Sequence, residues 1–245
     1  LEDGSELELF SSTMLGNPEI NIRMYGDNIN IRIWNSLLIS ITSSASGGIG
    51  KLDANRVTLQ VSDKGILFNF VYAYDFLITD CEKGIELVHV TTPLTLRNIR
   101  MINETTSFAC SWMDADVYVI NSECKWTFVW VSSTGKVHRQ YTFELKVVDE
   151  VGNPIPNARV RVWDKDGNLV IDKLTDASGV VSEIITRGYY DQDHGSELVD
   201  YAPFTLEIAK EGFVPYRTSF TPEEAIDWVI RLKHEDINVD EEVIT

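Results

Sequence analysis

The sequence predicts an all-β fold, because strand patterns of two kinds occupy most of the chain. In the first part, apolar and polar residues alternate, and the pattern recurs at a spacing of roughly twenty residues. In the second part, seven short strand patterns are separated by turn residues, at the spacing that is typical of a β-sandwich. We therefore expect two domains of different architecture.

The repeated pattern predicts strands that stack in parallel. Residues 65–68, 84–87, 107–110 and 125–128 each start at a small or polar residue and then place apolar residues two apart. A second series falls between them, at 76–78, 94–96 and 117–119. Each strand would pair best with its copy one repeat later, which defines a right-handed parallel β-helix. The alternative is an antiparallel sandwich, but this stretch lacks the Asn-Gly and Asp-Gly turns that favour hairpins.

We assign residues 1–134 to this first domain, with 1–18 as a cap or edge strand. The alternation also separates the two faces of the coils. Inward columns are expected to be Ile85 with Phe108 and Trp126, and Leu87 with Cys110 and Phe128. The outward strip is largely apolar and contains Leu67, Val88, Ala109 and Val129. Because exposed apolar strips usually mark interfaces, we expect self-association or docking on other surface proteins through this strip.

The repeat pattern resembles the parallel β-helix repeat family, which includes polysaccharide lyases, glycoside hydrolases, phage tailspikes and many cell-surface proteins. The resemblance extends over about half of the chain and rests on architecture. It implies the β-helix fold, together with either carbohydrate-active chemistry or a structural role.

A second domain is expected at residues 141–233, after a polar linker at 135–140 and before an acidic tail at 234–245. Its strands are expected at 141–149, 159–164, 169–174, 180–186, 204–210, 216–220 and 226–232. Three motifs follow one another in order, at 149–160, 175–179 and 209–213. They resemble the carboxypeptidase regulatory-like, transthyretin-like family, which implies a seven-stranded β-sandwich. The departure from that pattern is an insert at 188–202, rich in Tyr, Asp and Gly.

Composition and net charge limit the classes of partner that the chain is expected to bind. A net charge of −17 and a pI near 4.5 oppose binding to nucleic acid or anionic lipid, because both need stripes of Lys and Arg. No apolar run reaches the eighteen or so residues needed to cross a bilayer, so direct membrane insertion is not expected. The chain starts at Leu1 without a signal segment, as a processed chain or a fragment would. We expect an extracellular or cell-surface location.

Catalytic residues are not predicted. Asp75, Asp80, Asp114 and Asp116 lie near coil corners, where paired carboxylates could act on a glycosidic bond. However, Glu86 is the only acid at the outward positions aligned in these coils, which does not make a catalytic groove. The cysteines and histidines lack the spacing of a zinc site. None of the four histidines lies in a motif that would make it the partner of a cysteine nucleophile.

Three weaker binding signals remain. Asp164, Asp166 and Asn168 alternate around Gly167 like a calcium loop, but the Glu that would bind calcium through two oxygens is missing, so a tight turn is more typical. Calcium is thus the only ion considered, and no cofactor is expected. The insert offers a candidate binding loop at Tyr189, Tyr190, Asp191 and Asp193. A glycosylation sequon begins at Asn103, although such triplets often arise by chance.

These observations favour a non-catalytic extracellular or cell-surface structural protein, such as an adhesin, an envelope-layer protein or a filament subunit. It would act through protein–protein or glycan contacts. The alternative hypothesis is a carbohydrate-active enzyme of β-helix type, a lyase or hydrolase with an accessory sandwich. A carbohydrate-binding module without catalysis stands between the two.

Overall fold

A computed structural model describes residues 83–235 in full and, before them, the backbone of eight strands between residues 6 and 79. All regular structure in these residues is β-strand, which confirms the all-β class. Accordingly, the described part of the chain has no helix that could cross a membrane. Leu67, Asp75, Asp80 and Cys81 lie outside the described residues.

Contacts between residues divide the chain into two compact units. The N-terminal unit comprises Leu1–Gln140 and Thr186–Asp200, and the C-terminal unit comprises Tyr141–Ile185 and Tyr201–Thr245. The first boundary, between Gln140 and Tyr141, falls where the second domain was expected to begin. The second differs from expectation, since most of the insert predicted at 188–202 belongs to the N-terminal unit rather than to the sandwich.

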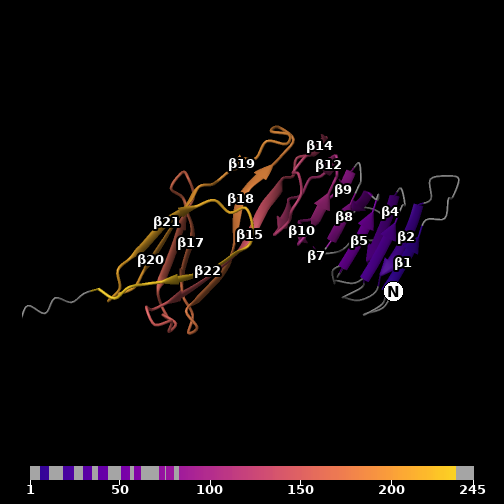
Figure 1. Cartoon of the computed structure of the whole chain (residues 1–245). Helices are drawn as coiled ribbons and strands as arrows, with labels where there is room; N and C mark the ends of the chain where they lie inside the picture. The colour runs from indigo at the N-terminus through magenta and orange to yellow at the C-terminus, as the bar shows by residue number, and fades with distance from the viewer. Residues whose placement is uncertain are drawn as a thin grey trace, which may run out of the picture. The chain divides into compact units, whose positions relative to one another are not determined.

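Three sheets build the N-terminal unit, and most of their strands are parallel (Figure 1). The first sheet contains β1 (Glu6–Phe10), β3 (Asn30–Trp34), β5 (Lys51–Asn55), β8 (Phe76–Thr79) and β11 (Arg100–Ile102). The second contains β2 (Glu19–Met24), β4 (Leu38–Ser43), β6 (Thr58–Val61), β9 (Lys83–Val88), β12 (Thr106–Ser111) and β14 (Phe128–Val131). The third contains β7 (Tyr72–Tyr74), β10 (Leu94–Arg97), β13 (Val117–Ile120), β15 (Val137–Val148), β18 (Val180–Tyr190) and β19 (Val199–Asp200).

From β7 to β13 the chain visits the three sheets in turn, and β14 and β15 then continue the second and third sheets. Strands of this region pair in parallel with their copies one coil later. Ile85 of β9 lies opposite Phe108 of β12, and Phe108 lies opposite Phe128 of β14. Leu87 lies opposite Cys110 in the same ladder. Ile85, Leu87, Phe108 and Cys110 are fully buried, as a stacked interior requires.

Between β9 and β15, each corner of a coil uses one residue with positive φ, the left-handed conformation that bends the chain between two strands. The corner after β9, β12 and β14 carries His89, Trp112 and Ser132. The two other corners carry Asn98 with Asn121, and Asn103 with Trp126. Because the aligned residues recur at the same place in successive coils, the corners stack as regularly as the strands do.

Two expectations about the last coil are corrected. Trp126 was expected opposite Phe108, but Phe128 occupies that place, so the predicted register is displaced by two residues. Residues 137–140, expected as a linker, instead begin β15, since Val137 continues the ladder of Val117 in β13. The cause is the number of corner residues: partners are 23 residues apart between Ile85 and Phe108 but 20 apart between Phe108 and Phe128.

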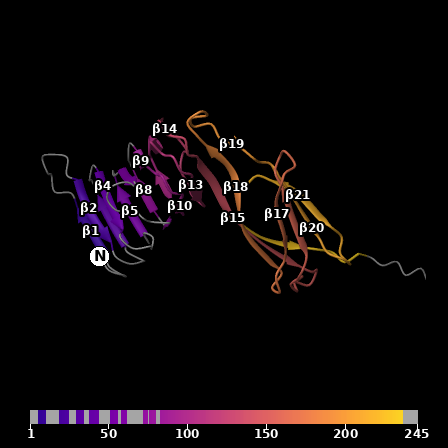
Figure 2. The same ribbon diagram turned by 180° about the vertical axis from the view of Figure 1, so that it is seen from behind.

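The C-terminal unit contains all seven strands expected there (Figure 2). One antiparallel sheet has the order β17 (Leu169–Leu174), β16 (Arg159–Trp163), β20 (Phe204–Ala209) and β21 (Tyr216–Phe220). The remaining strands are the second half of β15, the first half of β18, and β22 (Ile226–Arg231), which pairs with β15 in parallel. One apolar core joins them and includes Phe143, Leu145, Val160, Phe204 and Leu206, all fully buried.

Three turns of this unit share one design, in which an aspartate caps a tight five-residue loop whose fourth residue is a glycine with positive φ. The carboxylate of Asp149 accepts hydrogen bonds from the backbone N–H groups of Val151 and Asn153. Asp164 and Asp176 make the equivalent bonds in their own turns, 164–168 and 176–180. Local side-chain bonding of this kind is typical of aspartate-initiated turns.

Candidate functional site

Residues 186–200 close the last coil of the N-terminal unit. Tyr190 is only 3% exposed, and its ring packs on Trp126 and Phe128, with ring centroids 5.6 and 4.5 Å apart. Both partners belong to the last coil, and β14 is the edge strand of its sheet. Tyr190, predicted as part of a binding loop, therefore covers apolar rings that would otherwise face water.

Polar contacts hold the same loop on the edge of β14. Ser196 Oγ accepts a hydrogen bond from the backbone N–H of Phe128 at 2.8 Å, and the carbonyl of Gly195 accepts one from Trp130 Nε1 at 3.0 Å. The side-chain oxygen of Gln192 accepts a third from the N–H of Ser133 at 2.8 Å. Exposed edges of parallel sheets invite unwanted pairing, so this loop acts as a cap. Asp193 stays exposed on it.

Next to the cap lies a surface that we call the corner strip, consisting of residues 112–118 and 132–138. The two segments are aligned coil on coil, since the N–H of Thr134 donates to the carbonyl of Met113 and that of Val117 to the carbonyl of Lys136. Two aromatic stacks end the strip. Trp112 stacks on His89 at 5.0 Å, and Tyr118 stacks on His138 at 4.9 Å.

Charged side chains lie between these stacks. Asp116 Oδ2 is 2.9 Å from His138 Nε2, and Asp116 Oδ1 accepts a hydrogen bond from the N–H of Lys136 at 3.0 Å. Asp114 Oδ1 accepts a longer bond, 3.3 Å, from Thr134 Oγ1. The ammonium of Lys136 lies 3.9 Å from the centre of the Tyr189 ring, which extends the strip toward the cap.

Asp116, beside His138, and Asp191, beside His194, are both stabilised in their ionised form. Burial alone would raise the pKa of Asp116, but hydrogen bonds from His138 and Lys136 outweigh it, so the pKa lies below its ordinary value. The pKa of Asp191 is lowered in the same way: burial opposes ionisation, and the bonds from the side chain and backbone of His194 outweigh it.

We predict that the pair of Asp116 with His138 stabilises the fold only while Asp116 is ionised. A lowered pKa in the folded state adds stability that is present above the unfolded pKa, about 3.9, and is lost as the pH falls through the folded value. Thermal melts of the native chain and Asp116→Asn, recorded from about pH 7 to pH 2, should therefore differ most near neutrality and converge in acid. A difference that stays constant across this range would contradict the assignment.

Among the sequence-predicted acids, the structure brings Asp114 and Asp116 together on the corner strip. Within residues 83–235, no group of three or more acids, histidines or cysteines has the arrangement of a metal site. The calcium candidates behave as turn residues: Asp164 accepts bonds from the N–H groups of Asp166 and Asn168 and from Asn168 Nδ2. Those bonds engage both oxygens of the Asp164 carboxylate.

The predicted outward strip is only partly exposed. Val129 is 47% exposed, Val88 is half-buried and Ala109 is only 5% exposed. In the observed register, Ala109 lies opposite Val129, and Ser111 lies opposite Val131, which is 44% exposed. Among the described coils, exposed apolar surface of the predicted strip thus gathers on β14.

Buried polar groups elsewhere serve the coil. Glu104, within the sequon, is 1% exposed, and its Oε1 accepts hydrogen bonds from the N–H of Lys125 at 2.7 Å and from Ser107 Oγ at 3.0 Å. Cys110 and Cys124 are free thiols, and burial raises the pKa of Cys124 to about 12. Burial also raises the pKa of Cys110, so both thiols lack the ionised form that reacts.

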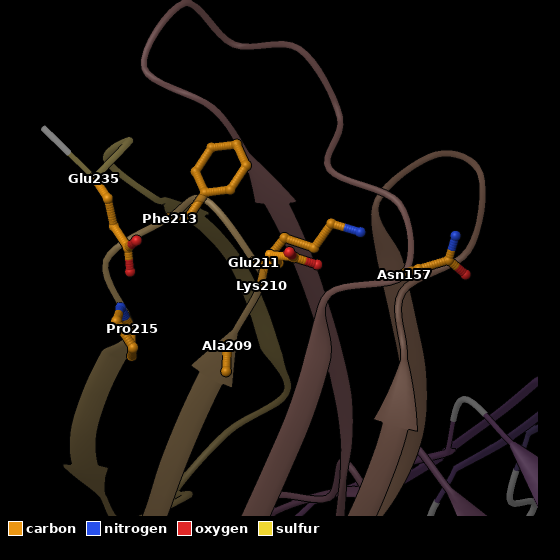
Figure 3. Close-up of a pocket in the computed structure, with 7 residues that line it drawn as sticks. All are labelled: Asn157, Ala209, Lys210, Glu211, Phe213, Pro215 and Glu235. Carbon is orange, nitrogen blue, oxygen red and sulfur yellow. The ribbon is translucent and has the colours of Figure 1, made fainter. Parts of the chain in front are cut away.

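A shallow pocket of about 470 Å³ lies in the C-terminal unit, at the predicted 209–213 motif (Figure 3). It is lined by Asn157, Ala209, Lys210, Glu211, Phe213, Pro215 and Glu235. Phe213 packs against His234 at 4.2 Å, which fixes its ring. Because one lysine and two glutamates share the rim, the pocket favours no single ligand charge. The corner strip is the stronger candidate.

Sequence reasoning missed the contributions of Trp112, Lys136 and His138 to this surface. Their signal was present, since Trp112 follows the end of its strand as His89 does one coil earlier. The corrected register would have aligned Tyr118 with His138 as well. The alignment failed because the sequence pattern did not reveal the 20-residue spacing between Phe108 and Phe128.

The fold and the corner strip define a two-unit all-β protein with an aromatic and carboxylate surface. No protein-family model matches the chain, and no curated protein matches it. Partial similarity was found to solved structures: the Bacillus anthracis TIE protein (20% identity, 44% of this chain and 19% of that chain, TM-score 0.33) and an Acinetobacter radioresistens catechol 1,2-dioxygenase (17% identity, 39% and 52%, TM-score 0.30). The 3-chlorocatechol 1,2-dioxygenase of Rhodococcus opacus is similar at 15% identity, with 39% and 60% covered and a TM-score of 0.29. This chain spans less than two thirds of each of them, and likeness at this level carries no functional argument.

Proposed function

We propose that the chain is a non-catalytic structural protein of the cell surface or extracellular space. In this proposal the N-terminal unit is a right-handed parallel β-helix, and the C-terminal unit is a transthyretin-like sandwich. Parallel pairing one coil later and stacked corners with positive φ support the first assignment. The seven strands, together with the motifs at 149–160, 175–179 and 209–213, support the second.

The observation that carries the proposal is the use of two carboxylates at the described corners, those of Asp116 and Glu104. Asp116 bonds to His138 and Lys136, and Glu104 bonds to Lys125 and Ser107. These groups hold one coil on the next. In a glycosidase the acid and base must be free to exchange protons with the substrate. The carboxylates therefore support a stiff scaffold better than the alternative of a carbohydrate-active enzyme.

A scaffold of this kind acts through contacts, and the exposed valines of β14 are the best-placed apolar surface for them. Val129 and Val131 are both more than 40% exposed and lie two residues apart on one face. We include self-association through this surface in the proposal, at salt concentrations that screen the net charge of −17.

Light scattering over a wide concentration range tests this function. The native chain should form dimers or larger assemblies, and the double variant Val129→Lys, Val131→Lys should remain a folded monomer. The matched control is Leu169→Lys, Val170→Lys, which changes two exposed apolar residues of the C-terminal unit and should leave assembly intact. A native chain that stays monomeric throughout would contradict the assembly role.

A further inference from the structure

We propose that the corner strip binds a neutral polysaccharide and that Trp112 is its central contact. The inference rests on the proposed surface role, and it names the ligand class for one surface of the N-terminal unit. Three properties of the strip lead to it: an open aromatic face, hydrogen-bonding groups beside that face, and the balance of charge.

Trp112 is presented to solvent by the fold. Its backbone has a φ of 51°, the left-handed corner conformation, and its side chain is held on one side by the His89 ring, at 5.0 Å and an interplanar angle of 11°. The aligned residue in the next coil is Ser132, which is too small to cover an indole. Trp112 is accordingly 48% exposed. The apolar face of a sugar ring can stack on a large aromatic face that is fixed in place and open to water.

A second aromatic pair lies along the same strip. Tyr118 stacks on His138, six residues after Trp112, so the two stacks are at most about 20 Å apart along an extended chain. An oligosaccharide can contact both stacks through different rings of one chain, whereas a monosaccharide would contact one stack at a time. The arrangement therefore fits an oligosaccharide segment better than a monosaccharide.

Polar groups between the stacks match the hydroxyls of a sugar. Asp114 is exposed, and its carboxylate accepts from Thr134 Oγ1 at 3.3 Å, which leaves capacity for further donors. Ser132 and Thr134 are exposed hydroxyl residues on the adjacent coil. Carboxylates accept hydrogen bonds from sugar O–H groups, and Ser and Thr hydroxyls both donate and accept.

Charge selects among the polysaccharides. Two carboxylates, Asp114 and Asp116, share the strip with one ammonium, Lys136, which already lies over Tyr189. The net charge of the whole chain is −17. The excess of carboxylates on the strip and the net negative charge of the whole protein both repel uronate or sulfate groups. Neither disfavours the binding of an uncharged polysaccharide. The ligand class is therefore a neutral polysaccharide.

The test is a binding titration of the purified chain with neutral hexasaccharides built from glucose, mannose, xylose and N-acetylglucosamine, and with hexagalacturonate as the anionic probe. Calorimetry should detect at least one neutral hexasaccharide with a Kd of about 1 mM or lower. Trp112→Asn should weaken that binding by about tenfold or more, as expected for a central aromatic contact. Asparagine tolerates positive φ, so this variant removes the ring and keeps the corner.

Controls separate ring loss from unfolding. Trp112→Tyr should retain binding within a few-fold because it keeps an aromatic face, and a thermal melt confirms that each variant is folded. Absence of binding to every neutral hexasaccharide, unchanged binding by Trp112→Asn, or tighter binding of hexagalacturonate would overturn the inference. Cleavage of a bound hexasaccharide, read from the same samples, would overturn the non-catalytic role while leaving the binding site in place.

Discussion

Leu87→Ala should lower the free energy of unfolding by about 2–5 kcal/mol, the range for deleting a fully buried leucine side chain. Leu87 is 0% exposed and sits in the inward column opposite Cys110, which is also fully buried. A closely stacked interior cannot collapse around the lost methyl groups without moving the neighbouring coils. Chemical denaturation followed by tryptophan fluorescence measures the change.

Leu174→Ala is the matched control, because it removes the same atoms from a leucine that is 58% exposed on β17. Surface changes of this kind usually stay within about 0.5 kcal/mol. If Leu174→Ala proved as damaging as Leu87→Ala, the inward assignment of Leu87 would not explain its effect.

The alternation of apolar residues was enough to predict which side chains face inward. Ile85, Leu87 and Phe108 were expected on inward columns and are fully buried. The displaced register of the last coil did not disturb this, because a shift of two residues preserves the face of every side chain, whereas a shift of one would reverse it. The register itself depends on the number of residues in each corner, and alternation within strands carries no information about that number.

The cap could not be predicted from local pattern. Tyr190 ends β18, a strand that begins in the sandwich, yet its partner Trp126 lies in the repeat domain. The hydrogen bond from Phe128 to Ser196 joins residues that are 68 positions apart. A segment rich in Tyr, Asp and Gly is equally typical of a solvent-exposed loop. Only the unsatisfied edge of the last coil distinguishes a cap from such a loop, and that edge exists only in the folded chain.

The corner strip shows the same limit. Asp114 and Asp116 were recognised from the sequence as corner acids, but their partners were not. His138 and Lys136 approach them because β13 and β15 pair in a register that sequence alone did not supply. The sequence therefore identified the acidic residues of the site one by one, but it did not show which side chains lie next to them.

Tyr190→Ala should destabilise the N-terminal unit by about 3–5 kcal/mol, as for other large buried aromatic residues. The ring fills the space above Trp126 and Phe128, so its removal leaves both rings open to water at the end of the coil. Tyr189→Ala provides the comparison at the next residue. Tyr189 is half-buried and faces the corner strip, so the loss should be clearly smaller. Denaturant melts of both variants measure the difference.

Amide hydrogen exchange of β14 tests most directly the claim that residues 186–200 cap the last coil. In the native chain, the Phe128 and Ser133 amides should be protected, because they donate to Ser196 and Gln192. In Tyr190→Ala, exchange across β14 should accelerate far more than exchange in β20 of the C-terminal unit. Unchanged protection of β14, with faster exchange in β20 instead, would show that the loop belongs to the sandwich and would contradict the account.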